Sequence, residues 1–372
     1  MPTLQQDYPW TISPLIVGAP MRLIATPPLA VEVSRAGGIG FLAGGTDLST
    51  LQSQLHETHS LLSSSPSIPP SRPNHLPPNP EASADILPIG IGIITWGASL
   101  PALLSTLQRP PYPAALWLFA PNHISDLQSW TEATRKATKS RTKIWIQIGS
   151  VRDAESVVRL CNPDVLVIQG VDAGGHGLTR GAGLTSLLPE CIDTVTKICH
   201  EEKLQLPAFV AAGGIMDGRG VASAFALGAQ GAVLGTRLLA SPEADITRGY
   251  REAVLRARDG GQTTMRTGLY DALRGTTGWP GSYGGRGVLN RSWEDAERGM
   301  GVEENKRLYE EMVERSGRDE GEEGWREGTG RLTTYAGTGV GLVKEVMPAR
   351  EIVEEVREGA RAVMKRLGSA KL

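Results

Sequence analysis

A single histidine stands in a glycine-rich turn that directly follows a run of apolar residues. The run Val165–Ile168 is short and mostly β-branched, and the turn after it carries glycines on both sides of His176. Glycine lets a backbone approach a flat or phosphorylated ligand closely, because it has no Cβ to intrude. Histidine is one of the few side chains that exchange a proton near neutral pH. A tight turn with an incidental histidine is the plainer alternative, but we predict that His176 is a catalytic residue on a ligand-binding loop.

Two more glycine turns follow later apolar runs and favour a phosphate site. Gly213-Gly214 comes after one run, and Gly235-Thr236 comes after the next. Backbone N–H groups in such turns, together with the Thr236 hydroxyl, can hold a phosphate monoester. In an α/β barrel these turns follow the seventh and eighth strands, where a phosphate site often forms. Two ordinary strand-to-helix turns are the alternative, and we predict the phosphate site.

All these turns belong to a repeated alternation of short apolar runs and helical patterns. Apolar runs without alternation are typical of parallel strands that are buried on both faces. Eight runs, each followed by a helical pattern, match an α/β fold of the (β/α)8 TIM-barrel class, with a doubly wound sheet as the alternative. The predicted strands are Leu15–Val17, Gly40–Ala43, Pro88–Ile94, Ala114–Phe119, Lys143–Ile148, Val165–Gln169, Ala208–Ala211 and Gly231–Leu234. The helices with clear bounds are Thr26–Ala36, Leu100–Gln108, Ser125–Thr138, Arg152–Leu160, Thr185–Glu201, Gly218–Leu227 and Pro242–Ala257.

The pattern divides the chain into a barrel and a C-terminal lobe. We predict the barrel over residues 14–260, with a Pro- and Ser-rich insertion at 63–84 that cannot bury enough apolar surface to order itself. Residues 261–372 are predicted to form an added lobe that packs on the barrel. This lobe contains a glycine-rich stretch at 263–291, a strongly charged stretch at 303–326 and an amphipathic helical pattern at 348–367.

Composition and charge exclude several classes of function. Of the 372 residues, 40% are hydrophobic and 21% are charged, as in an ordinary soluble enzyme with a sizeable core. A formal net charge of −2 gives no electrostatic case for a nucleic-acid partner. No apolar segment is long enough to span a membrane. The three cysteines lack metal-type spacing, so we expect reduced thiols and no metal site.

The sequences at the two ends of the chain indicate where in the cell we expect the protein. Residues 1–13 lack the pattern of a secretory signal. The final tripeptide, Ala370-Lys371-Leu372, differs by one small residue from the Ser-Lys-Leu peroxisomal address. We expect the protein in the cytoplasm or in the peroxisome, the latter with an import receptor as partner.

Other chemistry-bearing patterns are weaker. His123 follows the fourth predicted strand and is a second candidate for the site by position alone. Gly38–Ala43 fits G-x-G-x-x-A, but its strand follows the glycines, so a pyrophosphate would meet no helix N-terminus. No G-x-S-x-G turn of the kind that carries a nucleophilic serine is present.

Several of these segments, taken together, resemble the nitronate monooxygenase family, formerly called the 2-nitropropane dioxygenases. The resemblance covers most of residues 14–260 and recurs near 335–355. It implies an FMN-dependent TIM barrel that oxidises alkyl nitronates, and in some members neutral nitroalkanes, with O2 to a carbonyl compound and nitrite. The segments that carry it are Gly18–Met21, Gln169–His176, Ala212–Ile215, Gly235-Thr236 and the late glycine-rich segment Tyr335–Leu342.

The same resemblance implies the residues of the site. His176 matches the family's active-site histidine, Gly92 stands where the family often has an asparagine, and Asp172 stands where it usually has a glutamate. A neutral imidazole can take a proton from a nitroalkane or hydrogen-bond to nitronate oxygens. The flavin then supplies the redox chemistry. The implied FMN contacts are Ala19, Pro20, Met21, Gly92, Gln169, Gly174, Gly175, Gly213, Gly214, Val233, Leu234, Gly235 and Thr236.

Two other functions stay open at this point. An FMN-dependent reductase that uses NAD(P)H on quinones or enoyl thioesters has the same scaffold up to His176. A non-catalytic barrel that binds a phosphate ligand has the same glycine turns, and it purifies without colour.

Overall fold

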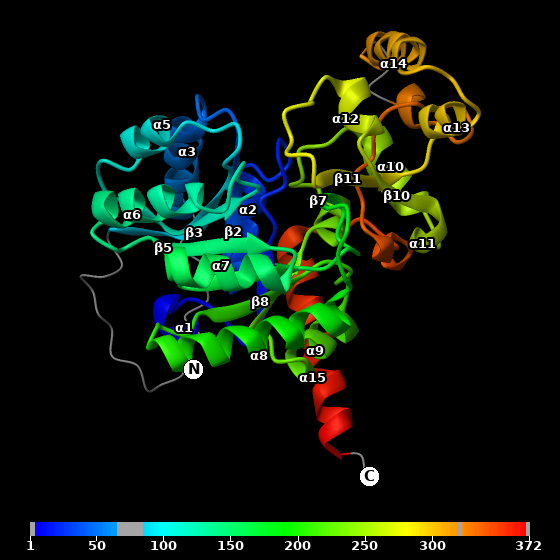
Figure 1. The fold of residues 1–372 in the computed structure, drawn as a ribbon. Helices are drawn as coiled ribbons and strands as arrows, with labels where there is room; N and C mark the ends of the chain where they lie inside the picture. Colours follow the sequence, from blue (N-terminus) through cyan, green and yellow to red (C-terminus); the bar gives the residue numbers. More distant parts are fainter. Residues whose placement is uncertain (1–3, 65–84, 318–321, 370–372) are drawn as a thin grey trace.

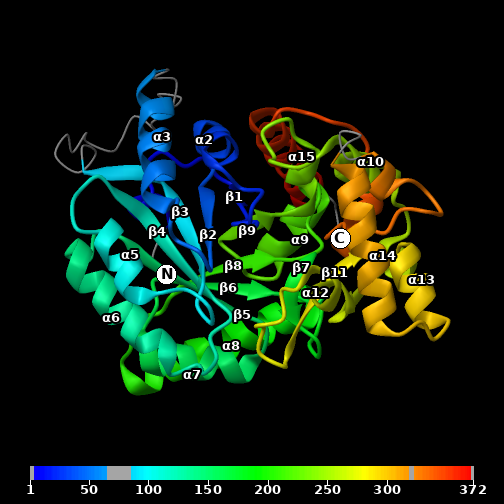
Figure 2. The same cartoon turned by 90° about the horizontal axis from the view of Figure 1, so that it is seen from above.

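A closed barrel of parallel strands forms the body of the protein (Figures 1 and 2). A computed structural model describes residues 4–64, 85–317 and 322–369. Within these ranges an 8-stranded sheet has the order β1-β9-β8-β6-β5-β4-β3-β2. The parallel bridge Val17–Ile39 joins the two ends of this order, and the Gly18 N–H donates to the Ile39 carbonyl at 2.9 Å. The predicted (β/α)8 barrel is therefore confirmed.

Each barrel strand lies where the sequence predicts one, with small differences at the ends. The strand β3 starts earlier than predicted, and β2 and β8 end later. The bounds are β1 (Leu15–Gly18), β2 (Gly40–Gly45), β3 (Ile86–Ile94), β4 (Tyr112–Phe119), β5 (Lys143–Ile148), β6 (Val165–Gln169), β8 (Ala208–Ala212) and β9 (Gly231–Leu234).

Alternate residues of each strand point into the barrel or outward to the helices. On β5 and β6, Trp145 and Val167 belong to the interior cluster, whereas Ile146 and Ile168 pack in the cluster beneath the helices. Both sets are buried and apolar, which is why the sequence shows continuous runs and no alternation. At the amino end, just after α1 (Leu4–Asp7), the Tyr8 hydroxyl accepts a hydrogen bond from Trp145 Nε1 at 2.6 Å.

Helices surround this sheet (Figure 2). Local capping fixes the start of several of them: the Ser150 side chain accepts from the Asp153 N–H, and the Asp217 side chain accepts from the first N–H groups of α9. The helices that follow barrel strands are α2 (Pro27–Arg35), α3 (Leu51–Ser64), α5 (Leu100–Thr106), α6 (Asp126–Thr138), α7 (Val151–Cys161), α8 (Leu184–Glu202) and α9 (Gly218–Ala226).

The last helix, α15 (Ala349–Ser369), packs on the barrel beside α9 and α2 (Figure 2). Its buried face presents Ile352, Val353 and Val356, each of which contributes about 1.5–3 kcal/mol by burial. The buried Arg357 donates to the Ala36 carbonyl at 2.7 Å. The helix therefore fills the place beside the eighth strand.

The interpretation of Pro242–Ala257 as the helix behind the eighth strand is wrong. After β9 the chain forms the short 3-10 helix η1 (Thr236–Ala240) and then α10 (Arg248–Arg256). Tyr250 and Val254 of α10 pack against Leu239 and Val340, away from the outer face of the sheet. The segment is helical over Arg248–Arg256, but its apolar face contacts a different partner.

The remaining elements form a lobe above the carboxyl ends of the strands (Figure 1). A small antiparallel sheet with the order β10-β11-β7 lies at its base, and the β7 strand comes from the His176 turn. The division of the chain at residue 260 stays a prediction. The lobe elements are β7 (Gly175–Leu178), α10, α11 (Gly260–Thr263), β10 (Thr264–Thr267), α12 (Leu269–Arg274), β11 (Tyr283–Val288), α13 (Arg291–Glu297), α14 (Val302–Ser316), η2 (Glu323–Trp325) and η3 (Thr338–Leu342).

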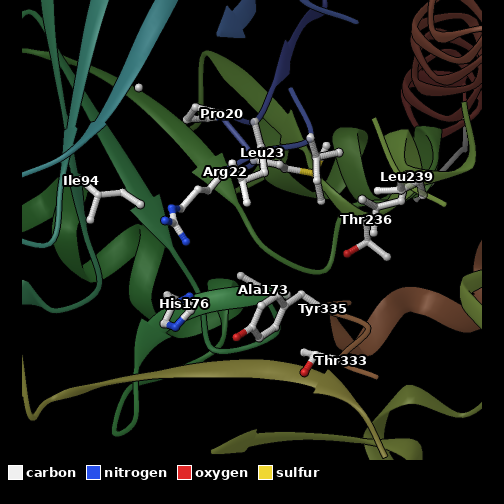
Figure 3. Close-up of a pocket in the computed structure, with 18 of the residues that line it drawn as sticks. Pro20, Arg22, Leu23, Ile94, Ala173, His176, Thr236, Leu239, Thr333 and Tyr335 are labelled. Carbon is white, nitrogen blue, oxygen red and sulfur yellow. The ribbon is translucent and has the colours of Figure 1, made fainter. Parts of the chain in front are cut away.

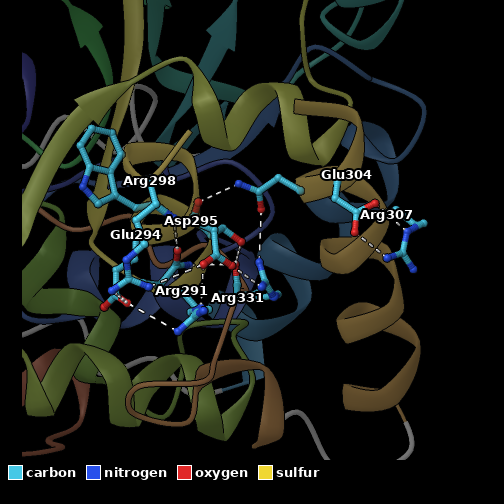
Figure 4. A network of polar contacts seen from close by, with 11 residues as sticks. Arg291, Glu294, Asp295, Arg298, Glu304, Arg307 and Arg331 are labelled. Atoms are coloured by element: carbon cyan, nitrogen blue, oxygen red, sulfur yellow. Dashed lines mark hydrogen bonds and ion pairs between the residues drawn. The ribbon is translucent and has the colours of Figure 1, made fainter. Parts of the chain in front are cut away.

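A buried carboxylate ties the outer part of this lobe together (Figure 4). Asp295 of α13 is 4% exposed and accepts hydrogen bonds from Arg331 and from Arg291. Arg331 also donates to Asn305 of α14 at 3.3 Å. The two guanidinium partners offset the desolvation cost of burying the carboxylate. The network therefore holds α13, α14 and the chain around Arg331 together.

Two predicted features lie outside the described residues. These are residues 65–84 of the predicted insertion, and the tripeptide Ala370-Lys371-Leu372. Within the described ranges, no helix has the length and apolar character needed to cross a membrane.

Candidate active site

A cavity of about 650 Å³ opens between the carboxyl ends of the barrel strands and the lobe. Residues at or just after the ends of most barrel strands line it, which is where TIM barrels carry their chemistry. The lobe closes the other side with Arg274, Trp279, Trp325 and Tyr335. Figure 3 shows Arg22, His176 and Tyr335 pointing into this space.

The structure brings almost all predicted site residues to this one cavity. Leu234 does not line it: it is fully buried on the outer side of β9, because neighbouring strand residues face opposite ways. His123 does not line it either, and is exposed. The predicted residues that line the cavity are Ala19, Pro20, Met21, Gly92, Gln169, Gly174, Gly175, His176, Gly213, Gly214, Val233, Gly235 and Thr236.

The turns after β8 and β9 present hydrogen-bond donors without partners. Among the described residues, the N–H groups of Gly214, Gly235 and Thr236 find no acceptor. Thr236 Oγ1 accepts from the Gly337 N–H at 3.0 Å, which leaves its own proton free to donate. Gly213 and Gly214 have φ of 109° and 73°, which favour glycine. Four donors at one end of the cavity fit a phosphate group.

Gly92 forms a flat wall of the cavity. A Cβ at this position would lie 2.2 Å from the Cβ of Pro20, so no side chain can stand there. The asparagine that the resembled family often has at this point is therefore absent for a packing reason. The wall between Pro20 and β3 suits the face of a planar ring.

Two glutamines at the inner ends of β5 and β6 take part in fixed hydrogen bonds. The Trp117 Nε1–H donates to Gln147 Oε1 at 3.0 Å, which leaves the amide N–H groups of Gln147 as donors at the cavity floor. Gln169 Nε2 donates to the carbonyl of His176 at 3.2 Å. Gln169 thus lines the cavity and also holds the backbone of the histidine turn.

The histidine turn needs glycine for a contact within the protein as well as for the expected ligand. A Cβ on Gly174 would lie 2.5 Å from the nitrogen of Gly337, so the two glycine-rich segments pack backbone against backbone. Asp172 joins the same two segments, because its Oδ1 accepts from Thr338 Oγ1 at 2.9 Å. The late segment resembling the family therefore supports the turn that carries His176.

A partly buried arginine also supports this turn. The Arg266 guanidinium donates to the carbonyls of Ala173 at 2.7 Å and Gly175 at 2.9 Å, and to Gly284 at 2.7 Å. Burial, and next the neighbouring Arg286, lower the pKa of Arg266 to about 10, so the group remains a cation near neutral pH. The charged fork satisfies carbonyls that the turn itself leaves unpaired.

His176 lies on β7, which pairs with β11, and its ring is held on two sides. Nε2 lies 2.9 Å from both carboxylate oxygens of Asp271 in α12. The ring of Trp279 stacks on the imidazole, with centroids 3.6 Å apart and planes at 6°. Such a fixed, partly buried imidazole at a cavity wall can act as a base or as a hydrogen-bond partner for an anion.

Sequence reasoning missed the lobe residues around the histidine. Asp271 lies in a stretch that shows no hydrophobic period, and nothing in its neighbours marks it. Trp279 carries a usable signal, because a lone tryptophan in the run Gly278–Gly281 has no strand or helix to belong to. Tyr335 opens the segment that resembles the family, but the resemblance does not identify it as a site residue.

Fold and cavity together define a class of protein. A (β/α)8 barrel with unpaired N–H donors at one end of its cavity, and a carboxylate-bound histidine in its wall, is the architecture of a barrel enzyme. In the described part of the chain, no group of three or more metal-ligating side chains gathers.

Comparison with known proteins identifies the family of barrel enzymes to which the chain belongs. A family model described as nitronate monooxygenase matches residues 127–275. The nitronate monooxygenase npaC of Metarhizium robertsii is 43% identical, over 97% of this chain and 95% of that protein. A nitronate monooxygenase of Neurospora crassa is 37% identical, over 98% and 93% of the two chains. The chain belongs to the nitronate monooxygenase family, whose members are flavin-dependent oxidoreductases.

Solved structures agree on the fold. A nitroalkane oxidase from Streptomyces ansochromogenes superposes with a TM-score of 0.69 at 22% identity, over 98% of this chain and 99% of that one. FabK from Thermotoga maritima gives a TM-score of 0.67 at 24% identity, over 99% of both chains. At these identities the likeness concerns the barrel and its added lobe only.

Proposed function

We propose that this protein uses FMN to oxidise alkyl nitronates with O2 to a carbonyl compound and nitrite. The observation that carries the proposal is the meeting of His176 and the unpaired N–H groups in one cavity. The relatives named nitronate monooxygenase, which match over nearly their whole length, support the reaction class.

The residues of the chain would divide the work as follows. Gly214, Gly235 and Thr236 donate to the phosphate, and the wall at Gly92 accepts the planar ring system. His176 takes the proton from a neutral nitroalkane and, once protonated, donates to the oxygens of the nitronate. The flavin, when bound, supplies the electron transfer and the reaction with oxygen. The apolar rings of Trp279 and Tyr335 keep water from the reacting carbon.

An absorbance spectrum and a nitrite assay test this proposal. We expect purified protein to be yellow, to release FMN on denaturation, and to consume O2 and form nitrite with ethyl nitronate. Colourless protein that takes up no FMN would leave a phosphate-binding barrel as the function. Rapid anaerobic bleaching by NADH or NADPH, without nitrite formation, would identify a reductase of quinones or enoyl thioesters.

We also propose import into the peroxisome through Ala370-Lys371-Leu372, which suits an enzyme that uses O2. A fluorescent fusion that ends in this tripeptide should collect in peroxisomes, and deletion of Leu372 should leave it in the cytosol. Identical distributions of the two fusions would remove the proposal.

A further inference from the structure

Asp271 contacts the active-site histidine through both oxygens of its carboxylate. It lies 95 positions from His176 in the sequence, yet both of its oxygens are 2.9 Å from Nε2. Its exposed fraction is 6%, so the pair is largely shielded from water. Shielding strengthens such a hydrogen bond, because water no longer competes for either partner.

Two hydroxyl groups fix the orientation of the Asp271 carboxylate. Thr276 Oγ1 donates to Oδ1 at 2.9 Å, and the Tyr335 hydroxyl donates to the same oxygen at 3.2 Å. Burial, and next the charge of Asp271, raise the pKa of Tyr335, so its hydroxyl keeps its proton and remains a donor. Oδ1 therefore has two fixed donors besides the imidazole.

This arrangement decides which ring nitrogen is available for chemistry. An ionised carboxylate accepts hydrogen bonds but donates none, so Nε2 must carry a proton. In the neutral ring the lone pair is then on Nδ1, which makes no hydrogen bond within the described residues. Stacking on Trp279 opposes the rotation of the ring that would exchange its two nitrogens.

We propose that Asp271 is the positioning residue that holds His176 as the Nε2–H tautomer, with Nδ1 as the atom that meets the substrate. The proposal rests on the proposed function for what Nδ1 does, namely to take the proton of a neutral nitroalkane. The tautomer itself does not depend on any substrate.

The variant Asp271→Asn separates this role from a merely structural one. Because Thr276 and Tyr335 both donate to Oδ1, the amide oxygen will occupy that position and the amide NH2 will face Nε2. The NH2 group then replaces Oδ2 at 2.9 Å from Nε2, and because it donates, it favours the tautomer in which Nε2 accepts and the proton lies on Nδ1, where it blocks the base. We expect kcat with neutral nitroethane to fall about 10²–10⁴-fold, the scale for loss of a general base, with a smaller change in KM.

Long-range ¹H–¹⁵N spectra of the histidine rings read the tautomer directly in the flavin-loaded protein. At a pH where the ring is neutral, we expect Nε2–H for His176 in the wild type and Nδ1–H in Asp271→Asn, with His176→Asn identifying the signal. The variant Asp271→Glu keeps an accepting carboxylate and should recover most of the lost rate. Asp193→Asn makes the same change on the exposed side of α8 and should alter neither readout.

The outcomes separate this proposal from the proposed function. An Nδ1–H form in the wild type overturns the proposal without any variant, and so does a rate loss in Asp271→Asn with an unchanged tautomer. If the tautomer switches as expected but no protein oxidises nitronates, the positioning role holds and the proposed function fails.

Discussion

At the scale of single residues, the glycines of the site solve three different problems. Gly174 allows contact with the backbone of Gly337, Gly92 allows contact with Pro20, and Gly214 adopts a φ of 73°. Of these three, only Gly214 has a positive φ, which by itself favours glycine. A glycine pattern in a sequence therefore indicates close packing as readily as a ligand site. Only the structure shows which backbone N–H groups lack a partner.

The variant His176→Asn tests the histidine as a base. Neutral nitroalkanes need a proton removed, so we expect their rate to fall about 10²–10⁴-fold. Nitronates formed beforehand need no proton removed, and asparagine can still donate a hydrogen bond, so their rate should change much less. Nitrite formation with nitroethane and with its anion measures both.

Equal losses on the two substrate forms would mean that His176 orients the anion and takes no proton. Wild-type rates on both forms would make the residue structural. His123 would not replace it, since it lies outside the cavity.

A charge placed among the unpaired N–H groups should expel the flavin. Gly214→Asp adds a carboxylate where the phosphate of the flavin is expected. The negative charges of the two groups repel each other at close range. We expect colourless protein after gel filtration, whereas Gly214→Asn, of similar size but neutral, should keep part of the flavin. Gly328→Asp is the matched control, because Gly328 also has a φ of 73° but lies outside the cavity. Fully yellow Gly214→Asp protein would place the phosphate elsewhere.

At the scale of elements, the barrel was predictable because each strand is a local apolar run. The same reasoning failed for the last helix of the barrel. A local pattern shows that a segment has an apolar face, but not what covers it, and α10 and α15 both have such faces. Arg357 of α15 contacts the Pro14 and Ala36 carbonyls more than 300 positions away, and no local signal encodes that pairing.

Close packing between α9 and α15 provides a test of this assignment. A Cβ on Gly218 would lie 2.3 Å from the nitrogen of Ala360, so Gly218→Ala should push the two helices apart. We expect it to lower the free energy of unfolding by about 1–3 kcal/mol, the usual cost of over-packing. Gly368→Ala, in α15 but with nothing within 4 Å, should be neutral or slightly stabilising. Urea unfolding measures both, and equal stability of the two variants would contradict the packing.

At the scale of the whole molecule, the site is shared between the barrel and the lobe. The phosphate donors and the flat wall come from the barrel, and Asp271, Trp279 and Tyr335 come from the lobe. The sequence predicted the barrel half because glycine turns follow its strands at known places. It could not predict the lobe half, because contacts such as Thr338 to Asp172 join residues 166 positions apart.

Because one cavity joins both parts, flavin binding should stabilise them together. A ligand that binds only the folded state adds about 2.7 kcal/mol at a hundred times its Kd, which corresponds to about 3–4 °C in Tm for a chain of this size. We expect added FMN to raise the Tm of flavin-free wild type by this amount and that of Gly214→Asp by nothing. Hydrogen exchange should slow in β7 and in η2, which border the cavity, and stay unchanged in α5 and α6. An equal shift of Tm in the two proteins, or protection confined to the barrel, would show that the ligand does not bridge the two parts.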